Sequence, residues 1–210
     1  MDENYERSTL SDYFGEAFPA IERFAQELTL QGELRGLIGP REIGRIWDRH
    51  ILNSAAVVQY LPQEGTIVDI GSGAGLPGLV IAAMRPQAEV VLVEPMERRC
   101  LWLAEMIEVM GLTNVDVKRG RAEEYHDAFD ADVVTSRAVA ALDKLARWSL
   151  PLLRPGGQLV ILKGRNVAAE IEPALKVLRK FRMSPPEILE ARTLDGAEST
   201  TVLRSTRGSK

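Results

Sequence analysis

A glycine-rich segment at residues 67–78 carries the chemistry that can be recognised most directly in this chain. It reads Ile-Val-Asp-Ile-Gly-Ser-Gly-Ala-Gly-Leu-Pro-Gly, an apolar strand that passes through four glycines into a helix. Glycine allows sharp turns and a close approach of the backbone to a ligand. The free N–H groups at the start of the helix then face that ligand. The segment therefore predicts a site for a nucleotide-like cofactor.

The glycine pattern fits two classes of cofactor. Counted from Gly73 it matches G-x-G-x-x-G, with Glu94 about 20 residues later, as the fingerprint of NAD and FAD enzymes requires. Counted from Asp69 it reads acid-x-G-x-G-x-G, the loop of S-adenosylmethionine enzymes. Asp69 would lie unfavourably near a pyrophosphate, whereas it would face the sulfonium and ammonium groups of S-adenosylmethionine directly or through water. Asp69 thus favours S-adenosylmethionine; its alternative role is to cap the turn after the strand.

Strands and helices are expected to alternate after residue 63. We predict strands at 66–71, 89–94, 114–118, 131–136 and 158–163, and helices near 79–85, 96–110, 142–152 and 167–181. The strands are apolar on both faces, as in a parallel sheet covered by helices on each side. This pattern predicts a doubly wound α/β domain with right-handed crossovers.

The C-terminal part predicts how the sheet ends. Two extended segments at 187–194 and 199–204 are joined by Asp195-Gly196-Ala197, which signals a hairpin. A parallel sheet closed by an antiparallel hairpin is typical of S-adenosylmethionine methyltransferases, whereas dinucleotide domains continue into a second half and a substrate domain. The chain after Leu162 is too short for a second βαβ half or a substrate domain. We therefore expect the Rossmann-like class I methyltransferase fold, with a mostly parallel seven-stranded sheet.

Residues 1–62 are expected to form an N-terminal helical cap on a cofactor-binding domain at 63–210, together one compact unit. Apolar residues recur there at three- and four-residue steps, which predicts a first helix from about residue 10 to 28. A break at 36–40 precedes a second helix that extends to about residue 57, with Pro40 in its first turn.

Composition limits the classes of function. At 210 residues, with 45% hydrophobic and 27% charged residues, the chain is typical of a single soluble domain. No apolar run is long enough for a membrane span, and the start lacks the regions of a signal peptide, so we expect a cytoplasmic protein. One cysteine and two histidines do not indicate a disulfide or a His-rich metal site. We expect no metal and, by default, a monomer.

The charge of the chain argues against nonspecific nucleic-acid binding. The formal net charge is −4 and the pI is near 5.4. A local basic face remains compatible with this balance, because Arg41, Arg45 and Arg49 recur every four residues. Such a cluster is more often a solvated helix face than a phosphate track, unless it converges with the glycine loop.

Residues at the ends of the second and third strands suit a nucleoside. Glu94 stands at the spacing where a carboxylate accepts both ribose hydroxyls. The loop at 119–124 is expected to lie against the adenine, with Ala122 supplying a backbone N–H and Glu123 accepting from the exocyclic amine. Glu124 is the alternative acceptor, and an acidic pair that opens a short helix is the non-functional alternative.

The end of the fourth strand indicates which atom is methylated. An Asn-Pro-Pro-Tyr motif for exocyclic amines is absent from the sequence, as is a Pro-Cys nucleophile. A target with an exposed lone pair remains, and guanine N7 needs no general base, so catalysis would depend on positioning and electrostatics. Arg137 could hold the cofactor carboxylate or the guanine edge, or form a structural ion pair.

Six sequence features between residues 39 and 163 occur together. They are Trp47-Asp48-Arg49-His50-Ile51-Leu52-Asn53-Ser54, the loop from Asp69 to Gly78, Glu94, Gly120 to Glu124, Ser136-Arg137-Ala138 and Lys163-Gly164. Each is weak alone, but the combination resembles the ribosomal RNA small subunit methyltransferase G family (RsmG, also called GidB). Where many relatives carry Asp-Ser, this chain has Asn53-Ser54.

The resemblance implies a function and a set of contacts. It implies methylation of N7 of a guanine in a decoding-region loop of 16S rRNA, giving 7-methylguanosine, with 16S rRNA or the small ribosomal subunit as partner. The residues that it implies as cofactor contacts are Gly71, Leu76, Ala122, Glu123 and Arg137. They are added to Asp69, Gly73 and Glu94, which the pattern itself indicates. The implied RNA-binding residues are Arg45, Arg49, His50 and Lys163. His50 is equally compatible with a packed or capping histidine.

Three other functions remain compatible with the residues. The acidic net charge suits a methyltransferase that acts on a small molecule. The glycines at 73, 75 and 78 suit a dinucleotide-dependent oxidoreductase. A noncatalytic module that retains the cofactor fold is the third.

Overall fold

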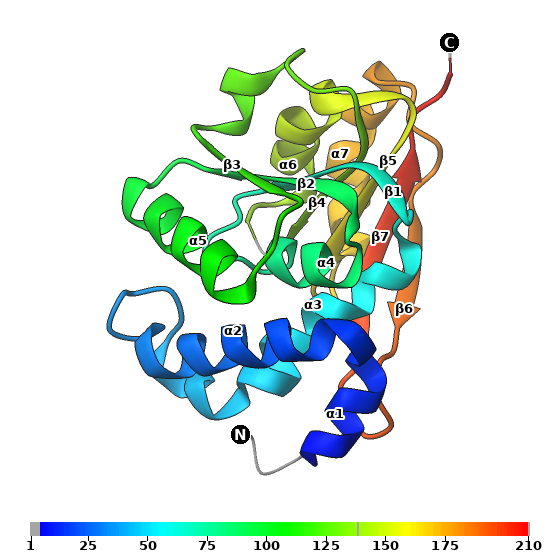
Figure 1. The fold of residues 1–210 in the computed structure, drawn as a ribbon. Helices are drawn as coiled ribbons and strands as arrows, with labels where there is room; N and C mark the ends of the chain where they lie inside the picture. Colours follow the sequence, from blue (N-terminus) through cyan, green and yellow to red (C-terminus); the bar gives the residue numbers. More distant parts are fainter. Residues whose placement is uncertain (1–4, 138, 210) are drawn as a thin grey trace.

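A mixed sheet of seven strands forms the centre of the molecule in the computed structural model, which describes residues 5–137 and 139–209. The strands lie in the order β3-β2-β1-β4-β5-β7-β6 (Figure 1). Their bounds are Glu64–Ile70 (β1), Gln87–Glu94 (β2), Val115–Arg119 (β3), Ala131–Arg137 (β4), Leu153–Lys163 (β5), Glu187–Ala191 (β6) and Thr200–Thr206 (β7). β1 to β5 are parallel, and β7 is antiparallel to both β5 and β6. The predicted α/β fold, with a mostly parallel seven-stranded sheet that ends in an antiparallel hairpin, is confirmed.

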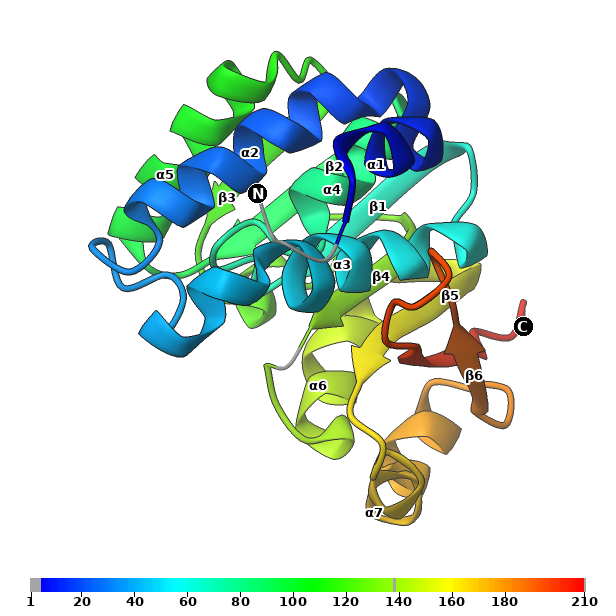
Figure 2. The same cartoon turned by 90° about the horizontal axis from the view of Figure 1, so that it is seen from below.

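Helices cover both faces of the sheet. Their bounds are Arg7–Phe14 (α1), Phe18–Gln31 (α2), Asn53–Ala56 (α3), Gly78–Met84 (α4), Glu97–Met110 (α5), Leu142–Ser149 (α6) and Ala168–Lys180 (α7). In Figure 2, α1 to α5 lie on one side of the sheet and α6 and α7 on the other. Among the described residues, no helix combines the length and apolarity needed to cross a membrane.

Alternation along the strands explains why both faces are covered. Ile67 of β1 packs into one hydrophobic cluster with α2, α4 and α5, whereas its neighbour Val68 packs into the second with α6 and α7. Successive side chains of a strand point to opposite faces, so an apolar run needs a cover on each. The central strands β1 and β4 are consequently buried along most of their length.

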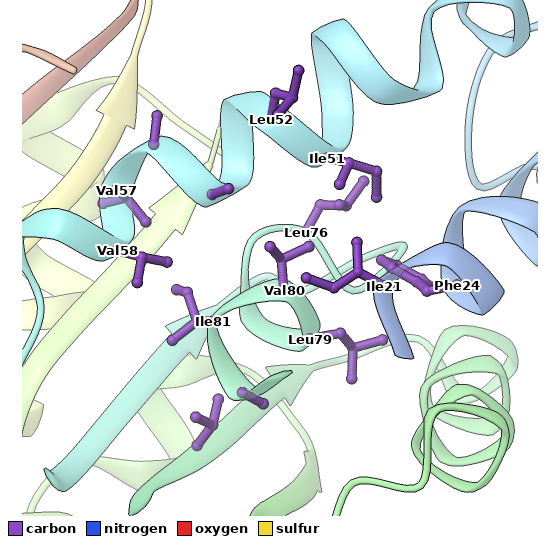
Figure 3. Close-up of a cluster of buried hydrophobic side chains, with 14 of the residues drawn as sticks. Ile21, Phe24, Ile51, Leu52, Val57, Val58, Leu76, Leu79, Val80 and Ile81 are labelled. Carbon is purple, nitrogen blue, oxygen red and sulfur yellow. The ribbon is translucent and has the colours of Figure 1, made fainter. Parts of the chain in front are cut away.

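The N-terminal helices share a hydrophobic cluster with the sheet. Figure 3 shows Ile21 and Phe24 of α2 and Ile51 of the following helical segment close to Leu76 and Val80 at the start of α4. All five side chains are nearly or fully buried. This packing fixes the N-terminal segment against the edge of the sheet where the glycine loop lies. The division at residues 62 and 63 stays a prediction.

The expectation of one regular helix after Pro40 is wrong. The segment changes type along its length, from a 3₁₀ helix at Pro40–Arg45 (η2), through a π-helix at Ile46–Leu52 (η3) and α3, to a 3₁₀ helix at Val57–Tyr60 (η4). Arg45 has φ −130° and ψ 25°, outside the helical region, and so separates η2 from η3. The four-residue spacing of the arginines therefore does not place them along one side of a single helix.

The C-terminal hairpin has a longer connection than predicted. β6 ends at Ala191 and β7 begins at Thr200, so residues 192–199 form the connection. Gly196 has φ 85° and supplies a left-handed turn within it. The Asp-Gly signal therefore located a turn correctly, although the turn lies inside a wider loop.

Candidate functional site

A cavity of about 1300 Å³ opens at the C-terminal ends of the parallel strands. Its wall combines the glycine loop after β1, the ends of β2, β4 and β5, the short 3₁₀ helix Ala122–Tyr125 (η5), η2 and η3, and residues 198 and 199 between β6 and β7. Ligands of open parallel sheets bind at this edge, where the strand order reverses. The reversal here lies between β1 and β4.

The glycine loop forms a cradle against which a ligand can lie. Gly71 has φ 68°, and its N–H donates to the carbonyl of Val93 at 2.8 Å. Gly73 has φ 56° and lines the cavity, and a Cβ there would have its nearest atom 3.6 Å away. A Cβ at position 73 would therefore contact only the Gly71 carbonyl oxygen and would otherwise take up space in the cavity, which suits a ligand that lies against this backbone.

Asp69 supports the loop from behind. It is fully buried and is not among the described residues that line the cavity. Its Oδ2 accepts from the Gly78 N–H at 3.1 Å, which fixes the start of α4, while its Oδ1 has no hydrogen-bond partner among the described residues. Burial raises the pKa of Asp69 to about 7, although the nearby Arg137 opposes the rise. The arrangement matches the capping alternative more closely than direct contact with a ligand.

Glu94 lies in the cavity wall at the end of β2. Its side chain is almost fully buried, and its Oε2 accepts from Gly73 N–H at 2.9 Å and its Oε1 from Met96 N–H at 3.0 Å. Arg99 Nη1 lies 3.9 Å from Oε2. A carboxylate offers about four acceptor positions. Glu94 therefore holds the glycine loop and still has lone pairs for the hydroxyls of a ribose.

The structure separates the two glutamates that the sequence left as alternatives. Ala122 is buried in the cavity wall, and Glu123 is exposed and lines the cavity. Glu124 is not among the described lining residues; its Oε1 accepts from the Arg121 N–H at 2.8 Å and so caps η5. Leu76 lies in the wall on the other side of the loop.

Arg137, at the end of β4, bonds to the N-terminal helical segment across the cavity wall. Its Nη1 donates to the carbonyl of Arg49 at 3.1 Å and to Asn53 Oδ1 at 3.4 Å. Its Nη2 lies 3.1 Å from His50 Nδ1. Burial lowers the pKa of Arg137 to about 10, and it remains charged at neutral pH. Its motif partner Ala138 lies outside the described residues.

His50 is a neutral link between Arg137 and Glu42. Burial, followed by the charge of Arg137, lowers the pKa of His50 to about 4. The neutral ring accepts from Arg137 at Nδ1 and carries its proton on Nε2, which lies 3.3 Å from Glu42 Oε2. His50 thus lies in the cavity wall and is packed at the same time.

The basic residues proposed for RNA binding are placed differently. Lys163 lines the cavity, but its Nζ donates to Ala140 O at 2.6 Å and pairs with Glu170 Oε2 at 2.7 Å. Arg49 lines the cavity with its side chain 47% exposed. Arg45 is not among the described lining residues and pairs with Asp48 Oδ2 at 2.6 Å. The structure therefore brings Arg49 and Lys163 to the cavity and leaves Arg45 at its margin.

A family model described as GidB, rRNA small subunit methyltransferase G, matches residues 18–192. The chain belongs to this family. Ribosomal RNA small subunit methyltransferase G of Thermobifida fusca is 48% identical over 93% of this chain and 82% of its own length. The protein of the same name from Leifsonia xyli subsp. xyli is 48% identical, over 96% of both chains. The enzyme class is therefore methyltransferase, which decides between the two cofactors in favour of S-adenosylmethionine.

Solved structures support the fold of this methyltransferase G family member. TYW2 of P. horikoshii in complex with MeSAdo superposes with a TM-score of 0.60 at 13% identity, covering 77% of this chain and 63% of that one. A SAM-dependent O-methyltransferase from Thermotoga maritima superposes with a TM-score of 0.57 at 18% identity, and the match covers 75% of this chain and 65% of that one. At these identities the likeness concerns the fold alone.

The cavity of this family member fits S-adenosylmethionine. Gly73 leaves the space that a Cβ would fill, Glu94 offers acceptors for ribose hydroxyls, and Leu76 and Ala122 supply apolar wall. Glu123 stands beside Ala122 with a free exposed carboxylate for an exocyclic amine. The individual contacts of these residues with the cofactor stay predictions.

Sequence reasoning missed several residues that line the cavity of this family member. They are Glu42, Asn53, Trp148 and Glu170, all of which line the cavity. Asn53 stood inside the Trp47 to Ser54 motif, and its amide oxygen now accepts from Arg137, so a carboxylate is not needed there for this contact. The others carried no sequence signal, because single residues on separate helices form no local pattern.

Proposed function

We propose that this chain transfers the methyl group of S-adenosylmethionine to N7 of a guanine in the decoding region of 16S rRNA. The family supports rRNA as the substrate. The observation that carries the proposal is the size and make-up of the cavity, whose 1300 Å³ exceed the roughly 300 to 1000 Å³ of ordinary ligand sites. The cavity continues from the cofactor loop past Arg137 to η2 and η3, and this extension leaves space for a nucleobase beside the cofactor.

The side chains near the end of β4 favour a target that needs no deprotonation. His50 Nδ1 faces Arg137 and Lys163 is held by Ala140 and Glu170, so neither is free to remove a proton. Guanine N7 has an exposed lone pair and attacks a methyl group without losing a proton first. Bound S-adenosylmethionine supplies that methyl group as an electrophile. The protein then contributes positioning and electrostatics.

Lys163 and Arg137 position the walls of the cavity in this proposal. Lys163 and the Leu142 N–H both bond Glu170 Oε2, each at 2.7 Å, which fixes the start of α6 against α7 and the end of β5. Arg137 fixes η3 against the end of β4. Both residues therefore set the distance between the cofactor loop and the target base.

Exposed cations at the mouth support an RNA substrate despite the net charge of −4. Arg49 is 47% exposed, and its nearest acid, Glu42 Oε1, lies 3.8 Å away. Arg45, beside Asp48 and Glu198, lies at the margin and is 41% exposed. Phosphates are neutralised by cations of this kind, free or exchanged from surface ion pairs. The small subunit or its free rRNA is the proposed partner, which places the reaction in the cytoplasm.

Transfer of labelled methyl tests the proposal. The protein is incubated with labelled S-adenosylmethionine and either unmodified small subunits or naked 16S rRNA, followed by digestion to nucleosides. We expect label in 7-methylguanosine from at least one of the two substrates. Label in another nucleoside, or in neither substrate, contradicts the proposal.

The acidic net charge favours a second candidate, a small-molecule methyltransferase. Salt separates the two, because binding to RNA weakens steeply with ionic strength as counterions are released. We expect transfer to rRNA to fall with added salt while the affinity for S-adenosylhomocysteine stays nearly constant.

A further inference from the structure

Glu42 presents a carboxylate to the cavity from η2, in the N-terminal part of the chain. It lies in η2, lines the cavity and keeps its side chain 33% exposed. Its Oε2 lies 3.3 Å from His50 Nε2 and its Oε1 lies 3.8 Å from Arg49 Nη1. Each carboxylate oxygen has two lone pairs, so both oxygens still have capacity to accept hydrogen bonds from a ligand.

The Glu42 carboxylate lies close to the residues at the end of β4. His50 Nδ1 accepts a hydrogen bond from Arg137 at 3.1 Å, and His50 Nε2, which forms no hydrogen bond among the described residues, lies 3.3 Å from Glu42 Oε2. One imidazole ring therefore separates the carboxylate from the arginine at the strand end. Arg137 also bonds the carbonyl of Arg49, so η3, which carries His50, is held against the end of β4.

Other acidic side chains of the cavity are less suited to face a base. Glu170 Oε2 is already shared by Lys163 and the Leu142 N–H. Glu198 is 61% exposed at the margin, and both Glu198 and Asp48 pair with Arg45. Glu123 lines the cavity from η5, beside Ala122, where the adenine is predicted to lie.

Guanine is the one standard base that presents two adjacent donors on its Watson–Crick edge, N1–H and the N2 amine. An ionised carboxylate only accepts, so it matches both donors at once. Adenine presents one amine beside an acceptor nitrogen, and that acceptor would face the carboxylate unfavourably. N7 lies on the opposite edge of guanine, which leaves it free to face the cofactor.

We propose that Glu42 selects the target base by accepting hydrogen bonds from N1–H and the N2 amine of the guanine that is methylated at N7. The inference rests on the proposed function and adds a specificity residue to it. Glu42 takes no part in the transfer step; it holds the ring so that N7 points towards the methyl donor.

Inosine provides the probe, because it keeps N7 and N1–H and lacks only the N2 amine. The test uses 16S rRNA, both naked and assembled into small subunits, that carries guanosine or inosine at the methylated position. It compares kcat/KM for wild type, Glu42→Gln and Glu42→Ala. We expect wild type to lose about 10-fold or more on inosine, as one hydrogen bond to a charged group is removed. Both variants should lose about 10-fold or more on guanosine and then discriminate less than 3-fold between the bases.

The control is Glu64→Gln, which removes the same charge at the opposite end of β1 and should keep the wild-type ratio. Calorimetric affinity for S-adenosylhomocysteine should be unchanged in all variants, since Glu42 is placed on the base side. A positioning role through His50 alone would lower both rates equally and keep the wild-type ratio, and that result overturns the inference. Absence of N7 transfer by wild type overturns the proposed function with it, whereas an unchanged ratio in Glu42→Gln overturns only the role of Glu42.

Discussion

Two buried carboxyl groups, those of Glu94 and Asp69, hold the glycine loop from different sides. Glu94 accepts from Gly73 and Met96 N–H groups in the cavity wall, while Asp69 accepts from the Gly78 N–H behind it. From the sequence, both were predicted to bind the cofactor: Glu94 by its distance of about 20 residues from Gly73, and Asp69 because its charge suits the sulfonium and ammonium groups. Glu94 lines the cavity and Asp69 does not. This difference depends on how the glycine loop folds over the ends of the strands, which the sequence pattern does not show.

Replacing Glu94 by Gln should weaken cofactor binding while the loop persists. The amide oxygen can still accept one backbone N–H, but the charged acceptor for the ribose hydroxyls is lost. We expect the affinity for S-adenosylhomocysteine to fall by about 1.5 to 3 kcal/mol, measured by calorimetry. The matched control is Glu89→Gln in the same strand, which should bind normally. An unchanged Kd for Glu94→Gln would remove the ribose assignment.

Asp69 should make stability depend on pH. Its pKa is about 7 in the folded protein, against 3.8 for an aspartate exposed to water, because burial disfavours the charge. The unfolded chain therefore releases this proton first, and the free energy of unfolding falls as the pH rises from about 4 to about 7. The full effect is about 4 kcal/mol.

The variant Asp69→Asn isolates this contribution. Its amide oxygen can still accept from Gly78 N–H, and no charge is buried. Denaturant unfolding at pH 4, 5.5 and 7 should show that the advantage of the variant over wild type grows with pH. Parallel pH profiles for the two proteins would contradict the assignment.

Polar contacts join the N-terminal helical segment to two strands of the sheet. Asn53 at the start of α3 accepts from Arg137 of β4 and donates from Nδ2 to Thr200 Oγ1 of β7 at 2.8 Å. One amide thus connects three elements that are far apart in the chain. The η3 segment between Arg45 and Asn53 forms cavity wall, so its position matters for the site.

Asn53→Ala should loosen this junction. We expect a loss of about 1 kcal/mol in the free energy of unfolding and faster amide hydrogen exchange in residues 46–56. Thr200→Val removes the same hydrogen bond from the other side. The double variant should therefore lose less than the sum of the single variants, and strict additivity would show that the contact contributes nothing.

The limits of prediction from the sequence differ between elements. The succession of β1 to β5 and their helices along the chain could be predicted because apolar runs and glycine breaks are local signals. The mixed helix types at 40–60 could not, since Pro40, Gly44 and the apolar residues only indicate a helix. The contact between Arg137 and His50 joins residues 87 positions apart, so it depends on the packing of the whole N-terminal segment.

The cavity exists because the whole molecule folds the N-terminal helices onto the sheet. Leu79, Val80 and Ile81 of α4 are fully buried in the cluster to which α2 and η3 contribute (Figure 3). Apolar packing fixes the helices, and Arg137, His50 and Asn53 then adjust the wall. We infer that the segments before and after residue 62 act as one unit, since the base side of the cavity comes from one and the cofactor side from the other.

The position of methylation on the rRNA tests the central claim most directly. N7-methylguanine carries a positive ring that borohydride reduces, after which aniline cleaves the RNA chain at that nucleotide. Small-subunit rRNA treated with the protein and S-adenosylmethionine should be cut at a single guanine in the decoding region, and the Gly73→Val variant, which fills the cofactor cradle, should leave it intact. Methyl incorporation without a cleavable guanine, or cleavage outside the decoding region, would contradict the account.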